Sequence, residues 1–134
     1  MVPLSFTEIT ARLKSLRLPE ADLVIGIGTG GIAPATLVAF HLDCELRIIT
    51  LNYRDEQNAP RHEAPVTIGN LPGKDELQGK RILLVDDVSV SGKTLVKALS
   101  LLDTPGIKTL CMKGKADFVL FPEIKDCVKW PWKE

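Results

Sequence analysis

The spacing of apolar residues predicts an amphipathic helix near the N-terminus. The segment Ser5-Phe6-Thr7-Glu8 has the form of a capping box, in which a serine and a glutamate three residues later satisfy free N–H groups at a helix start. Apolar residues then recur at helical intervals, at Phe6, Ile9, Leu13 and Leu16. Because a proline disfavours the helical conformation of the residue before it, we expect this helix to end before Leu18-Pro19.

A short apolar run at 23–25 predicts the first strand of a sheet. It leads into a glycine-rich stretch, Gly26-Ile27-Gly28-Thr29-Gly30-Gly31, after which residues 32–42 are compatible with a helix. Pro34 falls in the first turn of that helix, where the missing N–H of a proline is tolerated. The pattern is therefore a strand, a glycine loop and a helix.

The same alternation of strands and helices continues along the chain. Residues 46–51 and 82–85 are further apolar runs, and the second of them is apolar on both faces, as a central parallel strand must be. A second amphipathic helix is predicted around 95–102 and a last strand at 108–112. We therefore expect an α/β fold, a doubly wound and mainly parallel sheet flanked by helices, in one domain of residues 1–134. Such sheets bind ligands at the carboxyl ends of their strands.

Two segments depart from this alternation. Residues 54–79 are rich in proline, glycine, asparagine and charge, and they are too long for an ordinary connection in a domain of this size. Two interpretations fit them equally, a mobile loop that covers a ligand or a surface excursion with a small hairpin. Residues 114–134 are aromatic and irregular, and both tryptophans lie among the last five residues. We expect this tail to fold back onto the domain.

Composition and charge exclude several classes of function. The 17 basic and 17 acidic residues balance, so no overall field attracts nucleic acid or an anionic membrane. No apolar run has the length of a signal peptide or a membrane span. Cys44, Cys111 and Cys127 match no zinc or CxxC spacing, which favours free thiols, each buried by packing, in a reducing cytoplasm. We expect a soluble cytoplasmic protein whose anion sites are local.

The glycine loop at 26–31 formally satisfies the dinucleotide-binding pattern G-x-G-x-x-G. That pattern also needs an acidic residue at the end of the second strand, to hold a ribose hydroxyl of the dinucleotide. The second strand ends here in Leu51-Asn52-Tyr53, and no carboxylate follows before Asp55. The loop is therefore a weak candidate for a nicotinamide or flavin site, but the N–H groups at the following helix start suit an anion.

The stretch 82–95, ILLVDDVSVSGKTL, ends like an ATP-binding P-loop. In such a loop, backbone N–H groups surround a phosphate, and its first glycine falls at position 87 when counted back from Gly92-Lys93-Thr94. Asp87 occupies that position, and a carboxylate inside the anion cradle would repel phosphate. The stretch is therefore not a P-loop.

Asp86 and Asp87 end a buried strand, and the hydroxyls of Ser89, Ser91 and Thr94 follow within one short loop. Carboxylates accept hydrogen bonds from the hydroxyls of a sugar, whereas hydroxyl side chains and helix-start N–H groups bind a monophosphate. The loop therefore suits a ligand that carries both groups. The alternative is a polar strand end followed by serine helix caps.

The segment VDDVSVSGKTL at 85–95 resembles the motif that binds phosphoribosyl pyrophosphate (PRPP) in the type I phosphoribosyltransferases. The glycine loop at 26–31 resembles the pyrophosphate loop of that family, and Asn52-Tyr53 resembles the start of its mobile catalytic loop. Within the family, the chain is most similar to the xanthine-guanine and hypoxanthine type. Lys113 resembles the lysine that contacts the purine, and 127–132, CVKWPW, resembles the tail of these enzymes.

The resemblance implies a role for each matching residue. Asp86 and Asp87 would hold the ribose hydroxyls and, directly or through water, Mg²⁺; with Tyr53 they are the candidate catalytic residues. The 5′-phosphate would be bound by Ser89, Val90, Ser91, Gly92, Lys93 and Thr94. The pyrophosphate would be bound by Gly28, Thr29, Gly30 and Gly31. Lys113 and Val128 would contact the base, with 114–134 forming a hood over it and 54–79 the mobile loop.

The activity implied is transfer of the 5-phosphoribosyl group from PRPP to a nucleobase, with release of pyrophosphate. The expected acceptor is a 6-oxopurine, the expected setting is purine salvage, and the expected assembly is a homodimer. Two positions depart from the family pattern: Val90 stands where 6-oxopurine enzymes carry an aspartate, and Thr29 where many members carry a cation. The alternative is therefore a non-catalytic regulatory protein that binds PRPP or a nucleotide.

Overall fold

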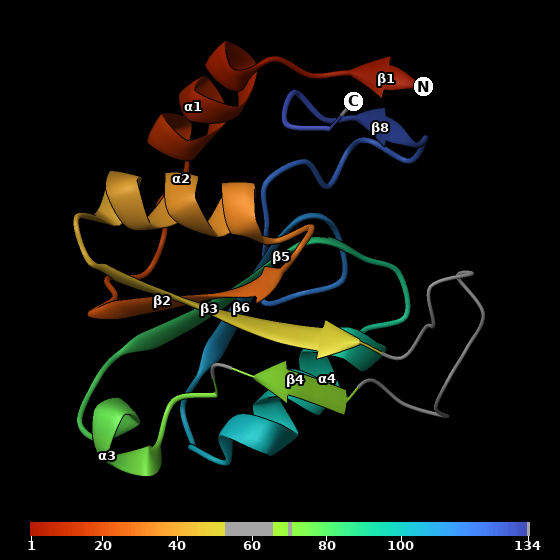
Figure 1. Cartoon of the computed structure of the whole chain (residues 1–134). Coiled ribbons are helices and arrows are strands. Elements are labelled where there is room, and N and C mark those ends of the chain that lie inside the picture. Colours follow the sequence, from red (N-terminus) through yellow and green to blue (C-terminus); the bar gives the residue numbers. More distant parts are fainter. Residues whose placement is uncertain (53–65, 70, 134) are drawn as a thin grey trace.

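The computed structural model describes residues 1–52, 66–69 and 71–133, which form a sheet with helices on both faces (Figure 1). The strands of this sheet lie in the order β4-β3-β2-β5-β6-β7. Their bounds are β2 (Leu23–Gly28), β3 (Glu45–Asn52), β4 (Val66–Gly69), β5 (Ile82–Ser89), β6 (Lys108–Gly114) and β7 (Phe118–Val119). Neighbouring strands are parallel except β3 and β4, which confirms the predicted mainly parallel sheet.

Each face of the sheet has its own helices and its own core. The helices α1 (Phe6–Ser15) and α2 (Ile32–Leu42) cover one face, and α3 (Lys74–Leu77) and α4 (Lys93–Leu102) cover the other (Figure 1). Successive residues of β5 alternate between the two cores, with Leu83 and Val85 under α1 and α2, and Leu84 on the side of α4. Because side chains of a strand point alternately to opposite faces, a strand buried on both sides is apolar throughout.

The predicted capping box at the start of α1 is confirmed. The Ser5 hydroxyl accepts a hydrogen bond from the Glu8 N–H at 3.1 Å, and the Glu8 carboxylate accepts one from the Ser5 N–H at 3.3 Å. Ile9 and Leu13 lie one turn apart on the buried face of this helix. In the ranges that the structure describes, no helix is long and apolar enough to cross a membrane.

The C-terminal tail folds back onto the domain, as predicted. Its strand β8 (Val128–Lys129) pairs in parallel with β1 (Val2–Pro3) at the opposite end of the chain. Trp130 is only 3% exposed and joins the core under α1 and α2. Trp132 stacks on it, with ring centroids 5.1 Å apart and an angle of 8° between the planes. The two chain ends therefore hold each other in place.

The segment predicted as a mobile loop at 54–79 is folded in its second part. β4 pairs antiparallel with β3, so the hairpin interpretation holds for 66–69, and α3 follows. Leu77 in α3 is fully buried against the core on the α4 side. The expected mobile loop is thereby reduced to 54–65, which lies outside the described residues and stays a prediction.

All three cysteines are free thiols, as expected, but they differ in burial. Cys111 is buried in β6 and Cys44 is partly buried, whereas Cys127 is exposed. The expectation of buried packing was therefore wrong for Cys127, which lies in the irregular tail just before β8. Its backbone rather than its side chain is used there, because the Cys127 carbonyl accepts a hydrogen bond from the Val2 N–H at 2.8 Å.

Replacing Leu77 by alanine is expected to lower the free energy of unfolding by about 2–5 kcal/mol, because the substitution leaves a cavity under α3. Urea denaturation of the two proteins measures the difference. Gln78→Ala, at the exposed neighbouring position, is the control and is expected to change stability by less than about 0.5 kcal/mol. A loss in Leu77→Ala no larger than in the control would show that α3 does not pack as described.

Candidate active site

The two loops singled out in the sequence lie side by side at the carboxyl ends of β2 and β5. These strands are neighbours, but the chain leaves β2 toward β3 on one side and β5 toward β6 on the other. Such a reversal of strand order opens a crevice, which is where doubly wound sheets bind ligands. The glycine loop after β2 and the acid pair, Asp86 with Asp87, lie on the two sides of this reversal.

Glycine is required in the loop after β2 because backbone approaches backbone there. A Cβ on Gly31 would lie 2.5 Å from the Ile27 carbonyl oxygen and 2.9 Å from that of Val85 in β5. A Cβ on Gly30 would lie 2.6 Å from Oδ2 of Asp87. The Gly28–Thr29 peptide bond is cis. The loop that was predicted to bind pyrophosphate therefore lies directly against the acid pair.

The acid pair is largely withdrawn from water. Asp86 is 8% exposed, and its Oδ1 accepts a hydrogen bond from the Asp87 N–H at 2.9 Å. Oδ1 of Asp87 accepts one from the Val88 N–H at 2.7 Å, and its Oδ2 accepts one from Nζ of Lys133 at 3.0 Å. Burial, followed by the negative charge of Asp87, raises the pKa of Asp86 to about 7. Near neutral pH the Asp86 carboxyl group therefore carries a proton in part of the molecules.

Nothing in the sequence indicated that Lys133 contacts Asp87. It lies in the C-terminal tail, far from Asp87 along the chain, and no local pattern connects a lysine after Trp132 with an acid on a central strand. The contact depends on the pairing of β8 with β1, which fixes the course of the tail.

The loop after β5 begins later than predicted, because β5 extends to Ser89. Ser91 Oγ accepts a hydrogen bond from the Lys93 N–H at 3.3 Å. The N-cap of α4 is Gly92, in the left-handed conformation with φ of 82° and without a side-chain cap. The interpretation as a helix cap is therefore wrong for Ser89, which lies in β5, whereas Ser91 does accept the N–H of the first residue of α4. Thr94 is in the first turn of the same helix.

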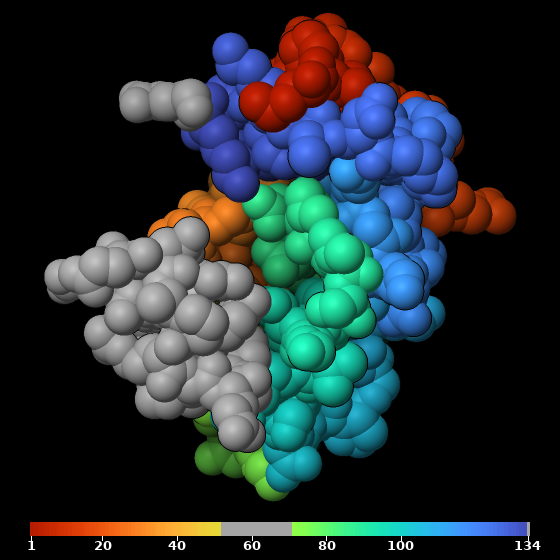
Figure 2. Space-filling view, turned by 90° about the vertical axis from the view of Figure 1, so that its right-hand side faces the viewer, coloured from red at the N-terminus to blue at the C-terminus, as the bar shows by residue number. Residues whose placement is uncertain are grey.

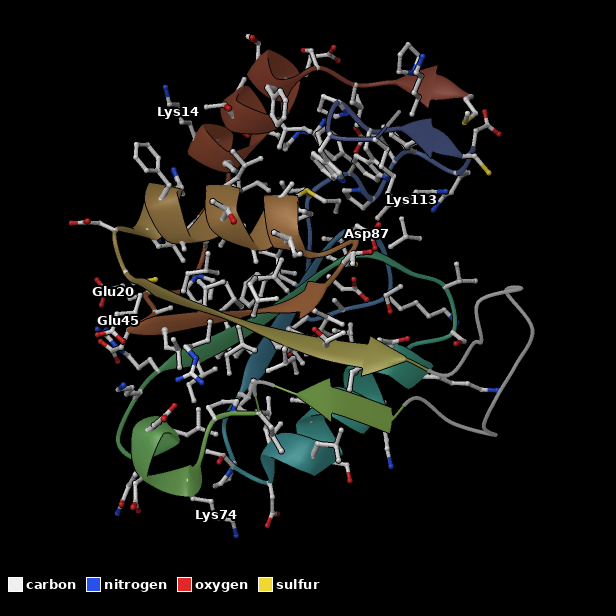
Figure 3. All side chains as sticks on the ribbon, in the orientation of Figure 1. Lys14, Glu20, Glu45, Lys74, Asp87 and Lys113 are labelled. Atoms are coloured by element: carbon white, nitrogen blue, oxygen red, sulfur yellow. The ribbon has the colours of Figure 1, made fainter. Side chains whose placement is uncertain are left out.

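A cavity of about 370 Å³ adjoins this loop on the side of β6. Lys113 lies opposite Val88 in the pairing of β5 with β6, and Figure 3 shows Lys113 and Asp87 near each other at the carboxyl edge of the sheet. The cavity is lined by Val88, Val90, Lys113, Gly114, Lys115, Pro122, Ile124 and Lys125. Its walls are partly apolar and partly basic, which suits a flat ring that carries oxygen atoms.

One residue that was predicted to contact the base, Val128, is not part of this lining. Val128 lies in β8 opposite Val2 and packs against the core under α1 and α2. Its contact with a base stays a prediction, and Pro122 and Ile124 of the tail line the cavity instead. Tyr53 lies outside the described residues.

The donor set at the acid pair fits Mg²⁺. In the described ranges there is no group of three or more histidine, cysteine or acidic side chains that would enclose a metal ion. Asp86 and Asp87 offer carboxylate oxygens near the carboxyl end of β5. Mg²⁺ keeps several waters and is usually bound through one or two carboxylates together with phosphates of the substrate, so this limited set is sufficient.

A larger cavity of about 640 Å³ lies at the opposite, amino edge of the strands and includes Asp22, Cys44 and Arg81 in its lining. Asp22 is already paired there, since Arg81 donates hydrogen bonds to both of its carboxylate oxygens. Those hydrogen bonds lower the pKa of Asp22 to about 2. Because Asp22 is already paired with Arg81, it is a weaker candidate for binding a ligand than the acid pair at the carboxyl edge.

A family model described as "Phosphoribosyl transferase domain" matches residues 6–115. The chain belongs to this family. The structure is similar to that of a purine phosphoribosyltransferase from Pyrococcus horikoshii, with a TM-score of 0.79 and 26% identity, covering 99% of this chain and 94% of that one. The resemblance to the type I phosphoribosyltransferases is confirmed, and the site described above is the one in which the family motif lies.

Curated relatives of the chain carry two different names. "Transcriptional regulator GfcR" of Methanothrix thermoacetophila is 32% identical over 92 residues, which are 67% of this chain and 42% of that protein. "Orotate phosphoribosyltransferase" of Sulfurisphaera tokodaii is 32% identical over 87 residues, which are 65% of this chain and 39% of that protein. The chain spans less than two thirds of the length of the curated relatives that it matches.

The raised pKa of Asp86 makes the stability of the fold depend on pH. Its ordinary value is 3.8, so between this value and about 7 the folded state keeps a proton that the unfolded state has released. The contribution of Asp86 to the free energy of unfolding is therefore largest below about pH 4, and it is lost as the pH rises to about 7. Asp86→Asn keeps the oxygen that accepts the Asp87 N–H and removes the titration.

We expect Asp86→Asn to melt at a higher temperature than the wild type at about pH 8, with a difference that shrinks toward about pH 4. Scanning calorimetry in metal-free buffer over this range measures it. A melting-temperature difference that does not change with pH would contradict a buried acid with a raised pKa.

Proposed function

We propose that this chain is a phosphoribosyltransferase that transfers the 5-phosphoribosyl group of PRPP to a 6-oxopurine and releases pyrophosphate. The observation that carries the proposal is the contact between Gly30 and Asp87. The acid pair, of which Asp86 is buried and Asp87 partly buried, lies between the two loops that we propose as anion sites, one after β2 and one after β5. PRPP has the matching order of groups, with a diphosphate, a ribose diol and a 5′-phosphate.

The charges of the crevice suit the three parts of this ligand. Carboxylates of Asp86 and Asp87 accept hydrogen bonds from two ribose hydroxyls, which have no charge of their own. The hydroxyl of Ser91 and the N–H groups at the start of α4 bind the 5′-phosphate. The diphosphate binds at loop 28–31 through the N–H groups of Thr29 and Gly30, since those of Gly31 and Ile32 already donate within the loop. Mg²⁺ bound at Asp86 and Asp87 would neutralise charge on the diphosphate and ribose oxygens.

The reaction is a displacement at the anomeric carbon of the ribose. The bond from this carbon to the pyrophosphate oxygen breaks, and the electron pair leaves with the pyrophosphate. A ring nitrogen of the base then donates its lone pair to form the new carbon–nitrogen bond, and the proton on the base is lost to solvent. The chain contributes by binding the leaving group, through loop 28–31, and by holding the ribose between the acid pair and the base.

Lys113 favours a 6-oxopurine as the acceptor. It lines the cavity next to the loop after β5, and its ammonium group is a donor only. An exocyclic oxygen accepts from it, whereas the amino group of adenine would face it donor to donor. The likeness to a purine phosphoribosyltransferase supports the same choice of base.

Val90 limits the rate. It also lines the cavity and is 77% exposed, so it lies where a group could reach the base. A valine side chain cannot accept the proton that the base loses. General acid–base help of this kind typically contributes about two to four powers of ten in rate, so the wild type is expected to be slow.

A second candidate function is regulation by binding PRPP or a nucleotide without turnover. The observation that favours it is that several curated relatives are named transcriptional regulators, while Val90 removes an acid from the base site. The balanced charge of this chain gives no basis for contact with DNA. Pyrophosphate release from PRPP, measured across adenine, guanine, hypoxanthine, xanthine and orotate, separates the two functions. Release with an oxopurine supports the enzyme, and binding of PRPP without release supports the regulator.

The double substitution Asp86→Asn and Asp87→Asn is expected to abolish PRPP binding and leave the protein folded, because each position loses a charged acceptor for a ribose hydroxyl. Isothermal titration calorimetry measures the affinity, and circular dichroism checks the fold. The matched control is Asp103→Asn, an acid at the far end of α4, which is expected to bind PRPP like the wild type. An unchanged affinity in the folded double variant would rule out the assignment of the acid pair.

Val90→Asp is expected to raise turnover with guanine, hypoxanthine or xanthine at least tenfold, since it supplies a proton acceptor, while PRPP affinity stays nearly constant. Val90→Asn has the same shape without the acid and is expected to stay slow. Lys113→Ala is expected to erase the preference for oxopurines over adenine, whereas Lys108→Ala, at the other end of β6, keeps it. Steady-state assays with each base decide the point. A wild type that prefers adenine would contradict the purine assignment.

A further inference from the structure

The loop that faces the diphosphate in the proposed site carries no charge. Its residues are Gly28, Thr29, Gly30 and Gly31, and no side chain can be added at the last two without a clash. A helix start supplies about half a unit of positive charge, whereas a diphosphate carries several units of negative charge. Mg²⁺ would neutralise part of this charge, and a cationic side chain from elsewhere in the chain would neutralise more of it.

Lys133 brings a cation to this point. Its Nζ lies 3.0 Å from Oδ2 of Asp87, and the same oxygen is 2.6 Å from where a Cβ of Gly30 would lie. The ammonium group and the glycine loop therefore meet at one carboxylate oxygen. The Lys133 side chain is 51% exposed and the Asp87 side chain 14%, so the ammonium group lies at the surface, above a largely buried carboxylate.

The tail holds Lys133 at this position. Trp130 is buried in the core, Trp132 stacks on it, and the N–H of Lys133 donates to the Trp130 carbonyl at 3.2 Å. Phe6 of α1 lies against Trp132, with ring centroids 6.2 Å apart. Figure 2 shows the C-terminal tail, in blue, lying directly over the green segment at the end of β5. The backbone of Lys133 is thus anchored, and its half-exposed side chain reaches over the acid pair.

The contact with Asp87 leaves the ammonium group able to bind a second anion. An ammonium has three N–H donors, and within the described part of the chain Asp87 accepts one hydrogen bond from it. A phosphate oxygen at the glycine loop could accept another. The lysine would then bridge the carboxylate that holds the ribose and the diphosphate that departs.

We propose that Lys133 is a ligand-binding residue of this site, which supplies from the C-terminal tail the positive charge for the diphosphate that loop 28–31 lacks. The proposal rests on the proposed function, since it takes PRPP as the ligand. The alternative is that Lys133 only neutralises Asp87. In that case its loss would change the affinity for every ligand with a ribose equally, whether or not the ligand carries a diphosphate.

The experiment compares PRPP with ribose 5-phosphate, which lacks the diphosphate, by calorimetry with and without Mg²⁺. Lys133→Gln is expected to weaken PRPP binding by about tenfold or more, as for loss of a charge-assisted hydrogen bond, and to change ribose 5-phosphate binding by less than about twofold. Lys133→Arg is expected to restore most of the PRPP affinity. Lys129→Gln removes an exposed lysine of the same tail and is the control without effect.

Three results with Lys133→Gln would overturn the inference. These are an unchanged affinity for PRPP, an equal loss for both ligands, which would mean that Lys133 acts only through Asp87, and tighter binding of PRPP, which would mean that Lys133 competes with the ligand. Thermal unfolding of each variant confirms that it is folded. Failure of the proposed function is seen separately, because the wild type itself would then not bind PRPP.

Discussion

The close approach of the loop after β2 to strand β5 determines where the rest of the site lies. A side chain on Gly31 would meet carbonyl oxygens of both strands, and one on Gly30 would meet the carboxylate of Asp87. With glycine at both positions, the start of α2 comes within reach of the acid pair on β5. The same contact brings the groups that we propose to bind a diphosphate next to those that we propose to bind a diol, at the reversal of strand order where doubly wound sheets bind ligands.

The negative charge of Asp86 and Asp87 has to be reduced or compensated, because both carboxylates are largely withdrawn from water. Burial raises the pKa of Asp86 to about 7, and the cation nearest to Asp87 among the described residues comes from Lys133 at the other end of the chain. A ligand that brings hydroxyl donors, with or without a divalent cation, meets the same need. Under the proposed function, the site receives a polyanion through its neutral sugar, and its positive charge lies around the edge rather than beneath the ligand.

The sequence predicted the parts of this arrangement that depend on local pattern. The capping box at Ser5, the burial of β5 on both faces and the acids at 86 and 87 can all be predicted from stretches of about ten residues. Lys133 and the lining by Pro122 and Ile124 could not be predicted, because they depend on contacts between distant parts of the chain. The position of Lys133 depends on the pairing of β8 with β1, and that of the other two on the hydrogen bond from the Phe121 N–H to the Met112 carbonyl of β6. The sequence also left undecided whether 66–69 forms a strand, since a polar segment with glycine and proline suits either a loop or an edge strand.

The most direct test of the account is a crystal structure of the chain with PRPP and Mg²⁺. The account predicts the ribose between Asp86 and Asp87, the 5′-phosphate at the start of α4, and the diphosphate between loop 28–31 and Lys133. A ligand bound instead at the amino edge of the strands, in the cavity lined by Asp22 and Arg81, would contradict it.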